Sequence, residues 1–141
     1  MGISIRATKG IYSFDCGCGG FFNLRKNIAI ALDKEFGENY AEIQYCHTNE
    51  ESYENDRKAE EIINRKKLDL EYKDVLDFLY APDDEGGSVS HRTCKKIADL
   101  LDKINLKHKC FRYTAYSHND YAEFKEFLRD CYSHRKKMRW S

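Results

Sequence analysis

Four residues near the N-terminal third of the chain carry the atoms that zinc prefers. Cys16 and Cys18 stand one residue apart, and Cys46 and His47 are adjacent further along. Thiolate and imidazole ligands in a tetrahedral arrangement would form a zinc site. The spacing departs from the two residues that usually separate paired zinc cysteines, and adjacent residues seldom both point inward. We therefore predict no cofactor, with zinc at these four residues as the alternative.

A glycine-rich stretch precedes the first predicted helix. Gly17, Gly19 and Gly20 lead directly into it, and the N-terminus of a helix can hold an anion. Arg25 and Lys26 would add positive charge. The stretch lacks both the lysine-serine ending of a P-loop and the full dinucleotide fingerprint. It predicts either a small-ligand or nucleotide-binding turn, or a turn that only needs residues able to take positive φ.

An acidic region occupies the middle of the chain. Residues 69–85 contain seven acidic side chains and one lysine. The loop at 83–90 partly matches a calcium loop, but Pro82, Gly86 and Thr93 stand where three principal ligands are needed. Solvated acids in a loop between two helices explain it better. The acidic surface that we expect to contact a partner comprises Asp77, Asp83, Asp84 and Glu85.

The C-terminal region is basic. Residues 101–141 contain ten lysines and arginines against five acids, and residues 133–141 are expected to be a basic tail, either frayed or returning as an edge strand. Such a tail could contact the phosphates of a nucleic acid. Alternatively, it is a solvated end that complements a helix dipole. The nucleic-acid candidates are Arg135, Lys136, Lys137, Arg139 and Trp140.

No local spacing selects a catalytic pair. Five histidines and six cysteines allow many imagined dyads, but none is singled out by its neighbours. Cys94 and Cys131 fall on the apolar faces of predicted helices, and we expect both to pack as small hydrophobic side chains. These observations favour a binding protein over an enzyme.

The elements that must position these residues follow from hydrophobic periodicity. Gly37 is expected to end the first helix, Pro82 the third, and Ser90 to cap the fourth. Asp120 would complete a capping box opened by Ser117. Residues 40–46 fit a strand or a helical extension. We expect helices over 21–36, 49–67, 71–81, 90–104 and from 117 to about 131, and strands over 3–8, 11–14 and within 107–116.

Length and composition bound the fold. The chain has 141 residues, 24 basic and 24 acidic, and 13% of its residues are aromatic, which suits one folded domain over residues 1–141. A net charge of zero argues against a nucleic-acid coat protein or an acidic DNA mimic. No secretory signal or membrane span is recognisable, so we expect a cytoplasmic protein. The predicted class is α+β, with four or five helices on a small antiparallel sheet.

The order of several short motifs resembles that of a group of small bacterial and phage-encoded proteins with no established activity. The matching stretches are Cys18-Gly-Gly-Phe21, Leu24-Arg25, the acidic loop at 83–90 and Cys94-Lys-Lys-Ile-Ala-Asp99. This resemblance implies a bacterial or phage setting, in which the compartment would be the host cytoplasm. Our leading hypothesis is a non-enzymatic protein-binding module, in concrete form an anti-CRISPR-like inhibitor of a host defence complex. The alternatives are a small-ligand or nucleotide-binding protein and a nucleic-acid binder.

Overall fold

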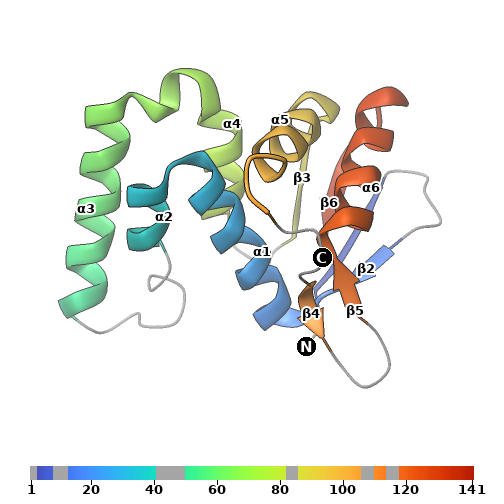
Figure 1. Cartoon of the computed structure of the whole chain (residues 1–141), viewed down its shortest axis with the longest axis horizontal. Coiled ribbons are helices and arrows are strands. Elements are labelled where there is room, and N and C mark those ends of the chain that lie inside the picture. Colours follow the sequence, from blue (N-terminus) through green and yellow to red (C-terminus); the bar gives the residue numbers. More distant parts are fainter. Residues whose placement is uncertain (1–2, 8–12, 41–49, 82–85, 106–109, 114–117) are drawn as a thin grey trace.

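The structure is a computed structural model that describes residues 3–7, 13–40, 50–81, 86–105, 110–113 and 118–141. Within these ranges, six helices pack with a four-stranded antiparallel sheet, and a two-stranded hairpin lies beside them (Figure 1). This is the single-domain α+β arrangement that the sequence predicts. It has one helix more than expected, because the predicted helix at 21–36 is divided.

The main sheet joins strands from both ends of the chain. Its order is β2-β1-β6-β3, and every neighbouring pair is antiparallel. The C-terminal residues are therefore a central strand rather than a frayed end or an edge strand. The strands are β1 (Ser4–Ala7), β2 (Ser13–Asp15), β3 (Gly87–Val89) and β6 (Met138–Trp140).

Helices cover one face of this sheet (Figure 1). Phe14 of β2 packs against Phe124 and Phe127, at ring-centroid distances of 5.5 and 5.3 Å. Trp140 of β6 packs against Phe78 at 5.2 Å. Since side chains alternate across a strand, the residues between these core positions face away from the helices. The covering helices are α1 (Gly17–Leu32), α4 (Leu68–Tyr80), α5 (His91–Leu101) and α6 (Tyr121–Ser133).

The expected end of the first helix at Gly37 is wrong. Asp33 takes an extended conformation that ends α1, and its Oδ1 accepts a hydrogen bond from Phe36 N at 3.0 Å to start α2 (Lys34–Tyr40). Gly37 lies inside α2. A Cβ at Gly37 would be 2.5 Å from Ile30 Cα, so this glycine permits the close packing of α2 on α1.

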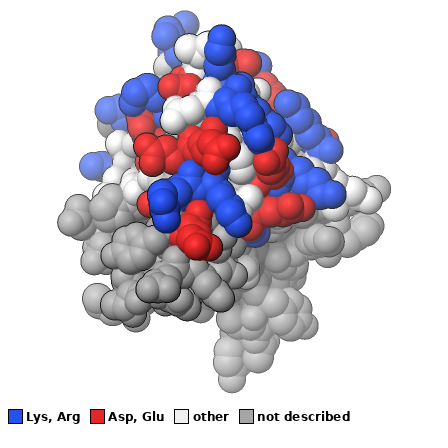
Figure 2. Space-filling view, turned by 90° about the vertical axis from the view of Figure 1, so that its left-hand side faces the viewer, with Lys and Arg blue, Asp and Glu red and all other residues white. Residues whose placement is uncertain are grey.

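The charged helix predicted at 49–67 is confirmed as α3 (Glu50–Lys66). Ala59 and Ile62 are buried in its narrow apolar stripe. Arg65 pairs with Glu35 of α2 at 2.7 Å, and positive and negative side chains are interspersed on this end of the molecule (Figure 2). Interspersed charges of both signs are typical of a helix face that is in contact with solvent.

The segment from α4 to α5 positions the acidic region. The helix α4 starts three residues earlier than expected, and Ala81 is extended, as a following proline favours. The strand β3 (Gly87–Val89) departs from the expected loop at 83–90, because Gly87 and Ser88 pair with Trp140 and Arg139 of β6. The N-cap at Ser90 is confirmed, since Thr93 N donates to its Oγ at 3.3 Å. The helix α5 ends at Leu101, before the expected residue 104.

A strand within 107–116 is confirmed as β4 (Cys110–Tyr113), which pairs with β5 (His118–Asp120). The expected start of the last helix at residue 117 is wrong, because Asp120 is its N-cap and accepts from Glu123 N at 2.8 Å. The apolar residues that recur at helical spacing along this helix are all buried: Tyr121, Phe124, Phe127, Leu128 and Cys131. The ambiguous stretch 40–46 lies outside the described residues beyond Tyr40, which ends α2.

Candidate functional site

Of the four residues considered for zinc, Cys16 is the one whose side chain lies in the described part of the chain. Cys16 is buried and its Sγ lies 3.5 Å from Phe14 O, a hydrogen bond inside the core. The side chain of Cys18, together with Cys46 and His47, lies outside the described part. Among the described residues, no cluster of three His, Cys, Asp or Glu side chains is suited to a metal ion. The zinc alternative stays a prediction.

The glycine-rich stretch is helical rather than a turn. Gly17, Gly19 and Gly20 form the first turn of α1. Among the glycines that the structure describes, only Gly86 has positive φ. The expectation that these three glycines provide positive φ is therefore wrong.

Arg25 and Lys26 both reach main-chain carbonyls of neighbouring helices. The Arg25 side chain is fully buried, with its guanidinium carbon 4.2 Å from the Phe21 ring centroid. Its Nη1 lies 3.4 Å from Leu79 O in the last turn of α4, where a cation complements the negative end of the helix dipole. Lys26 donates to Gly37 O. Both side chains join helices, and neither adds charge to an anion site at the helix start.

Cys94 and Cys131 are buried where α5 packs on α6, as predicted. A hydrogen bond with Cys131 and burial raise the pKa of Cys94 well above its usual value. The Cys94 thiol is therefore protonated and unreactive at neutral pH. This pair belongs to the core.

A cavity of about 310 Å³ opens between α4 and β3. Phe78 and Trp140 form an aromatic wall, and Asp77 lies at the helix side with an exposed carboxylate. Of the predicted acidic surface, Asp77 is placed here, while Asp83, Asp84 and Glu85 lie outside the described residues. The lining residues are Asp74, Asp77, Phe78, Ala81, Gly86, Gly87, Ser88, Val89 and Trp140.

The two aspartates of this cavity have different surroundings. Asp74 accepts from Thr93 Oγ1 at 2.7 Å and from Lys96 Nζ at 3.2 Å. Partial burial acts to raise the pKa of Asp74, but the hydrogen bonds from Thr93 and Lys96 outweigh it and hold the pKa below its usual value. Asp77 pairs only loosely, with exposed Lys73 one turn away at 3.2 Å. Asp74 thus joins α4 to α5, and Asp77 is the acid that can meet a ligand.

The strand side of the cavity is the edge of the sheet. In the described part of the chain, β3 pairs with β6 on one side and with no strand on the other. A Cβ at Gly87 would be 2.4 Å from the Trp140 ring, so the strand lies directly on the indole. Trp140 is 3% exposed, and its Nε1–H has no acceptor among the described residues. The cavity thus combines an open strand edge with a buried aromatic donor.

The predicted nucleic-acid residues are divided by the structure. Trp140 is a core residue, so its ring is not available to stack on a base. Arg139 lies on the opposite face of β6 and is exposed. Arg135 and Lys136 belong to the connection between α6 and β6, where Lys136 N donates to Cys131 O at 2.8 Å. Lys137 is exposed just before β6.

Sequence reasoning missed Arg6. The alternation of residues 3–8 places Arg6 on the polar side of the first predicted strand. The alternation does not show which residue lies beside Arg6 in the sheet, and the structure shows that this residue is Arg139, directly opposite across the β1–β6 pair. This pairing needs the strand order, which joins the two ends of the chain.

Comparisons with known proteins give no relative: no family model, curated protein or solved structure matches the chain. None of the helices in the described ranges has the length and apolar character needed to cross a membrane.

Proposed function

We propose that the chain is a protein-binding module that receives an extended, basic segment of another protein at the open edge of β3. The observation that carries this proposal is the cavity beside that edge, with an exposed carboxylate at its rim and aromatic rings in its wall. The chemistry fits one lysine or arginine side chain that enters this cavity and pairs with Asp77 at its rim.

The strand edge supplies the first half of the recognition. An edge strand presents backbone N–H and C=O groups that a second chain can pair with. Ser88 is exposed, and Val89 is half-buried beside the cavity. A partner strand paired with β3 would send alternate side chains toward the helix side of the sheet, where the cavity lies.

The cavity supplies the second half. A lysine or arginine packs its methylene stem on apolar surface while its charged head stays near water or an acid. The Lys73–Asp77 pair is exposed on both sides, 75% and 67%, and such pairs contribute only about 0.3–0.5 kcal/mol. Asp77 can therefore exchange Lys73 for a partner's cation at little cost.

The resemblance to phage-encoded proteins gives the proposal its concrete form, an inhibitor that occupies a basic segment of a host defence complex. Electrostatic complementarity with a basic segment would set orientation and association rate. The backbone pairing would hold the partner after the first encounter.

The test is selection of binders from a randomised nonapeptide library displayed on phage. We expect the enriched peptides to carry a lysine or arginine flanked by alternating strand-forming residues. Trp140 is the only tryptophan of the chain and lines the cavity, so its fluorescence should change saturably when a selected peptide is titrated.

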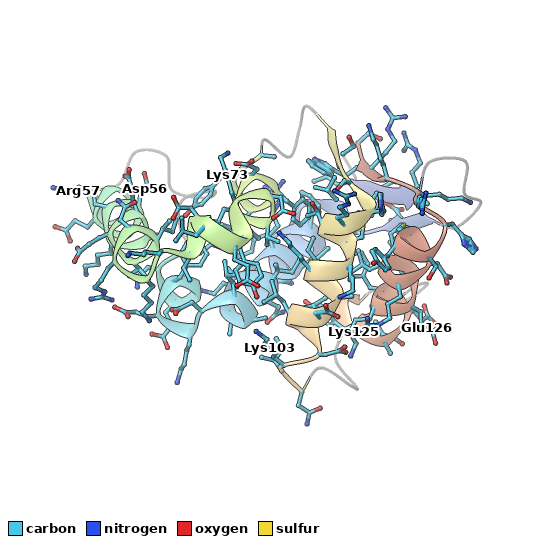
Figure 3. All side chains as sticks on the ribbon, turned by 90° about the horizontal axis from the view of Figure 1, so that it is seen from above. Asp56, Arg57, Lys73, Lys103, Lys125 and Glu126 are labelled. Atoms are coloured by element: carbon cyan, nitrogen blue, oxygen red, sulfur yellow. The ribbon has the colours of Figure 1, made fainter. Side chains whose placement is uncertain are left out.

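The Asp77→Lys variant should lose binding of the selected peptides by tenfold or more, about 1.4 kcal/mol. The matched control is Asp56→Lys, because Asp56 is an exposed acid on α3 at the far end of the molecule (Figure 3). Failure to enrich any binder, enrichment of peptides without a basic residue, or equal binding by Asp77→Lys would contradict the proposal.

A further inference from the structure

Two arginines lie directly opposite each other in the two central strands of the sheet. Arg6 of β1 pairs in register with Arg139 of β6, and both side chains are exposed. Residues directly opposite in an antiparallel pair share a face, and like charges there are destabilising. Nothing in the packing requires this arrangement, since both side chains point away from the core. An anion between the two guanidiniums would turn this repulsion into attraction.

Serines continue the row to both edges of the sheet. Ser13 of β2 lies opposite Arg6, and Ser88 of β3 lies opposite Arg139. Ser141, directly after β6, accepts a hydrogen bond from Arg6 Nη1 at 2.9 Å, which fixes the guanidinium over the sheet. The row thus places two cations in the centre of the sheet, with the exposed side chain of Ser88 beside Arg139 and that of Ser141 beside Arg6.

This face is the one that the helices leave open. Ile5 and Trp140, which neighbour the two arginines along their strands, are buried on the helix side. Among the described residues that face outward from the sheet, none is aromatic and one is acidic: Asp15, on β2 opposite Ser4. The row of side chains runs across the strands on an exposed face, which suits an extended ligand rather than an enclosed small molecule.

We propose that this outer face, defined by Arg6, Arg139, Ser4, Ser88 and Ser141, binds the phosphate backbone of nucleic acid. Arginine contacts phosphate with two parallel N–H groups, and serine hydroxyls also donate to phosphate oxygens. Opposite residues in a strand pair are about 4.5–5.5 Å apart at Cα, so the two guanidiniums can reach one phosphate or two neighbouring ones. The zero net charge of the chain does not oppose this, because the charges are locally unequal.

The absence of an aromatic side chain from the described part of this face determines the kind of binding. Base stacking supplies much of the affinity of single-strand binders, and base-edge contacts supply sequence specificity. The described part of this face offers no ring for stacking, and the arginines and serines of the row would contact phosphates alone. The binding should therefore be independent of sequence and strongly dependent on salt.

The experiment measures fluorescence anisotropy of a labelled DNA duplex of mixed sequence at several salt concentrations. Wild type should bind, with equal affinity for a second duplex of scrambled sequence. Arg6→Ala and Arg139→Ala should each weaken binding by about tenfold and lower the slope of log K against log salt by about 1. Asp15→Asn should strengthen binding, because it removes the acid from this face.

The matched control is Arg57→Ala, because Arg57 is an exposed arginine on α3, at the opposite end of the molecule from the sheet (Figure 3). It should bind as wild type does. Thermal unfolding in the absence of DNA separates folding from binding: Arg139→Ala should unfold at the same or a higher temperature, since it relieves the repulsion between the two arginines.

Binding without salt dependence, equal losses in Arg57→Ala and Arg6→Ala, or no binding by wild type at low salt would overturn the proposal. Competition with inorganic phosphate separates a single-phosphate site from a backbone site: displacement of the DNA at equimolar phosphate would also overturn the proposal.

The Asp77→Lys variant should keep its DNA affinity, because Asp77 does not lie on this face of the sheet. The DNA-binding surface and the β3 edge can therefore fail independently.

Discussion

Asp74 and Asp77 show how two acids of the same helix can serve different purposes. Both line the cavity beside β3. Asp74 is held by Thr93, a residue 3% exposed, and by Lys96, so it links α4 to α5. Asp77 meets only an exposed lysine on its own helix. Removing the charge should therefore affect stability at the first position and partner binding at the second.

We predict that Asp74→Asn lowers the free energy of unfolding by about 1 kcal/mol, because hydrogen bonds to a charged group are lost at a partly exposed site. Asp77→Asn should cost less than about 0.5 kcal/mol. Urea denaturation followed by circular dichroism measures both. Equal losses in the two variants would show that Asp74 does not link the helices.

The stability difference between wild type and Asp74→Asn depends on pH in a direction that is set by the lowered pKa of Asp74. The pKa of Asp74 is lower in the folded protein than its usual value, so the folded state favours the charged form. Its contribution is present at neutral pH and is lost as pH falls through the folded pKa. The difference between wild type and Asp74→Asn should therefore shrink between about pH 7 and about pH 2. A difference that stayed constant over this range would contradict the assignment.

At the scale of elements, two helical glycines have opposite roles. Gly19 lies in the first turn of α1, and a Cβ there would have no atom within 4 Å. Gly37 lies within α2, where a Cβ would meet the backbone of Ile30 at 2.5 Å. Gly19 therefore carries only the entropic cost of a glycine in a helix. Gly37 is needed because a larger residue would keep α2 from approaching α1.

We predict that Gly19→Ala raises the free energy of unfolding by up to about 1 kcal/mol, because alanine loses less conformational freedom in a helix. Gly37→Ala should lower it by about 1–3 kcal/mol, since the added methyl forces α2 away from α1. The two variants make the same chemical change, so thermal unfolding of the pair isolates the packing effect. Stabilisation by both substitutions would mean that α2 can move away from α1 without loss.

Local patterns predicted the elements better than their ends. The apolar period of residues 121–131 predicted the buried face of α6, and a serine cap predicted the start of α5 at Ser90. The end of α1 at Asp33 was not predicted, because glycine is the more common residue at the end of a helix and Gly37 lies nearby. The actual role of Gly37, its close contact with Ile30 of α1, depends on how the two helices pack. The strand β3 was missed because Gly87 has the character of a loop residue, and only its contact with Trp140 explains it.

At the scale of the whole molecule, the two ends of the chain together form the centre of the sheet. Arg6 and Ser141, which are hydrogen-bonded, are 135 positions apart in the sequence, and Ser4 and Ser141 exchange two backbone hydrogen bonds of 2.9 and 3.1 Å. No periodicity in the sequence carries information about this pairing. Composition alone shows that the tail is basic. It does not show that Trp140 is buried, because that burial depends on contacts with Phe21 of α1 and Phe78 of α4. For this reason the sequence suggested a nucleic-acid contact for a residue that belongs to the core.

The central place of β6 predicts the result of removing it. Deletion of residues 138–141 would separate β3 from β1 and remove two core side chains, Met138 and Trp140. Loss of a buried tryptophan alone costs about 3–5 kcal/mol, which is comparable with the total stability of many domains. We therefore expect the shortened chain to lose its cooperative unfolding transition in urea, whereas Arg139→Ala, which changes the same strand only on its outer face, keeps it. If the shortened chain unfolded cooperatively at the wild-type urea midpoint, residues 138–141 would be a dispensable tail and the sheet would be held without them.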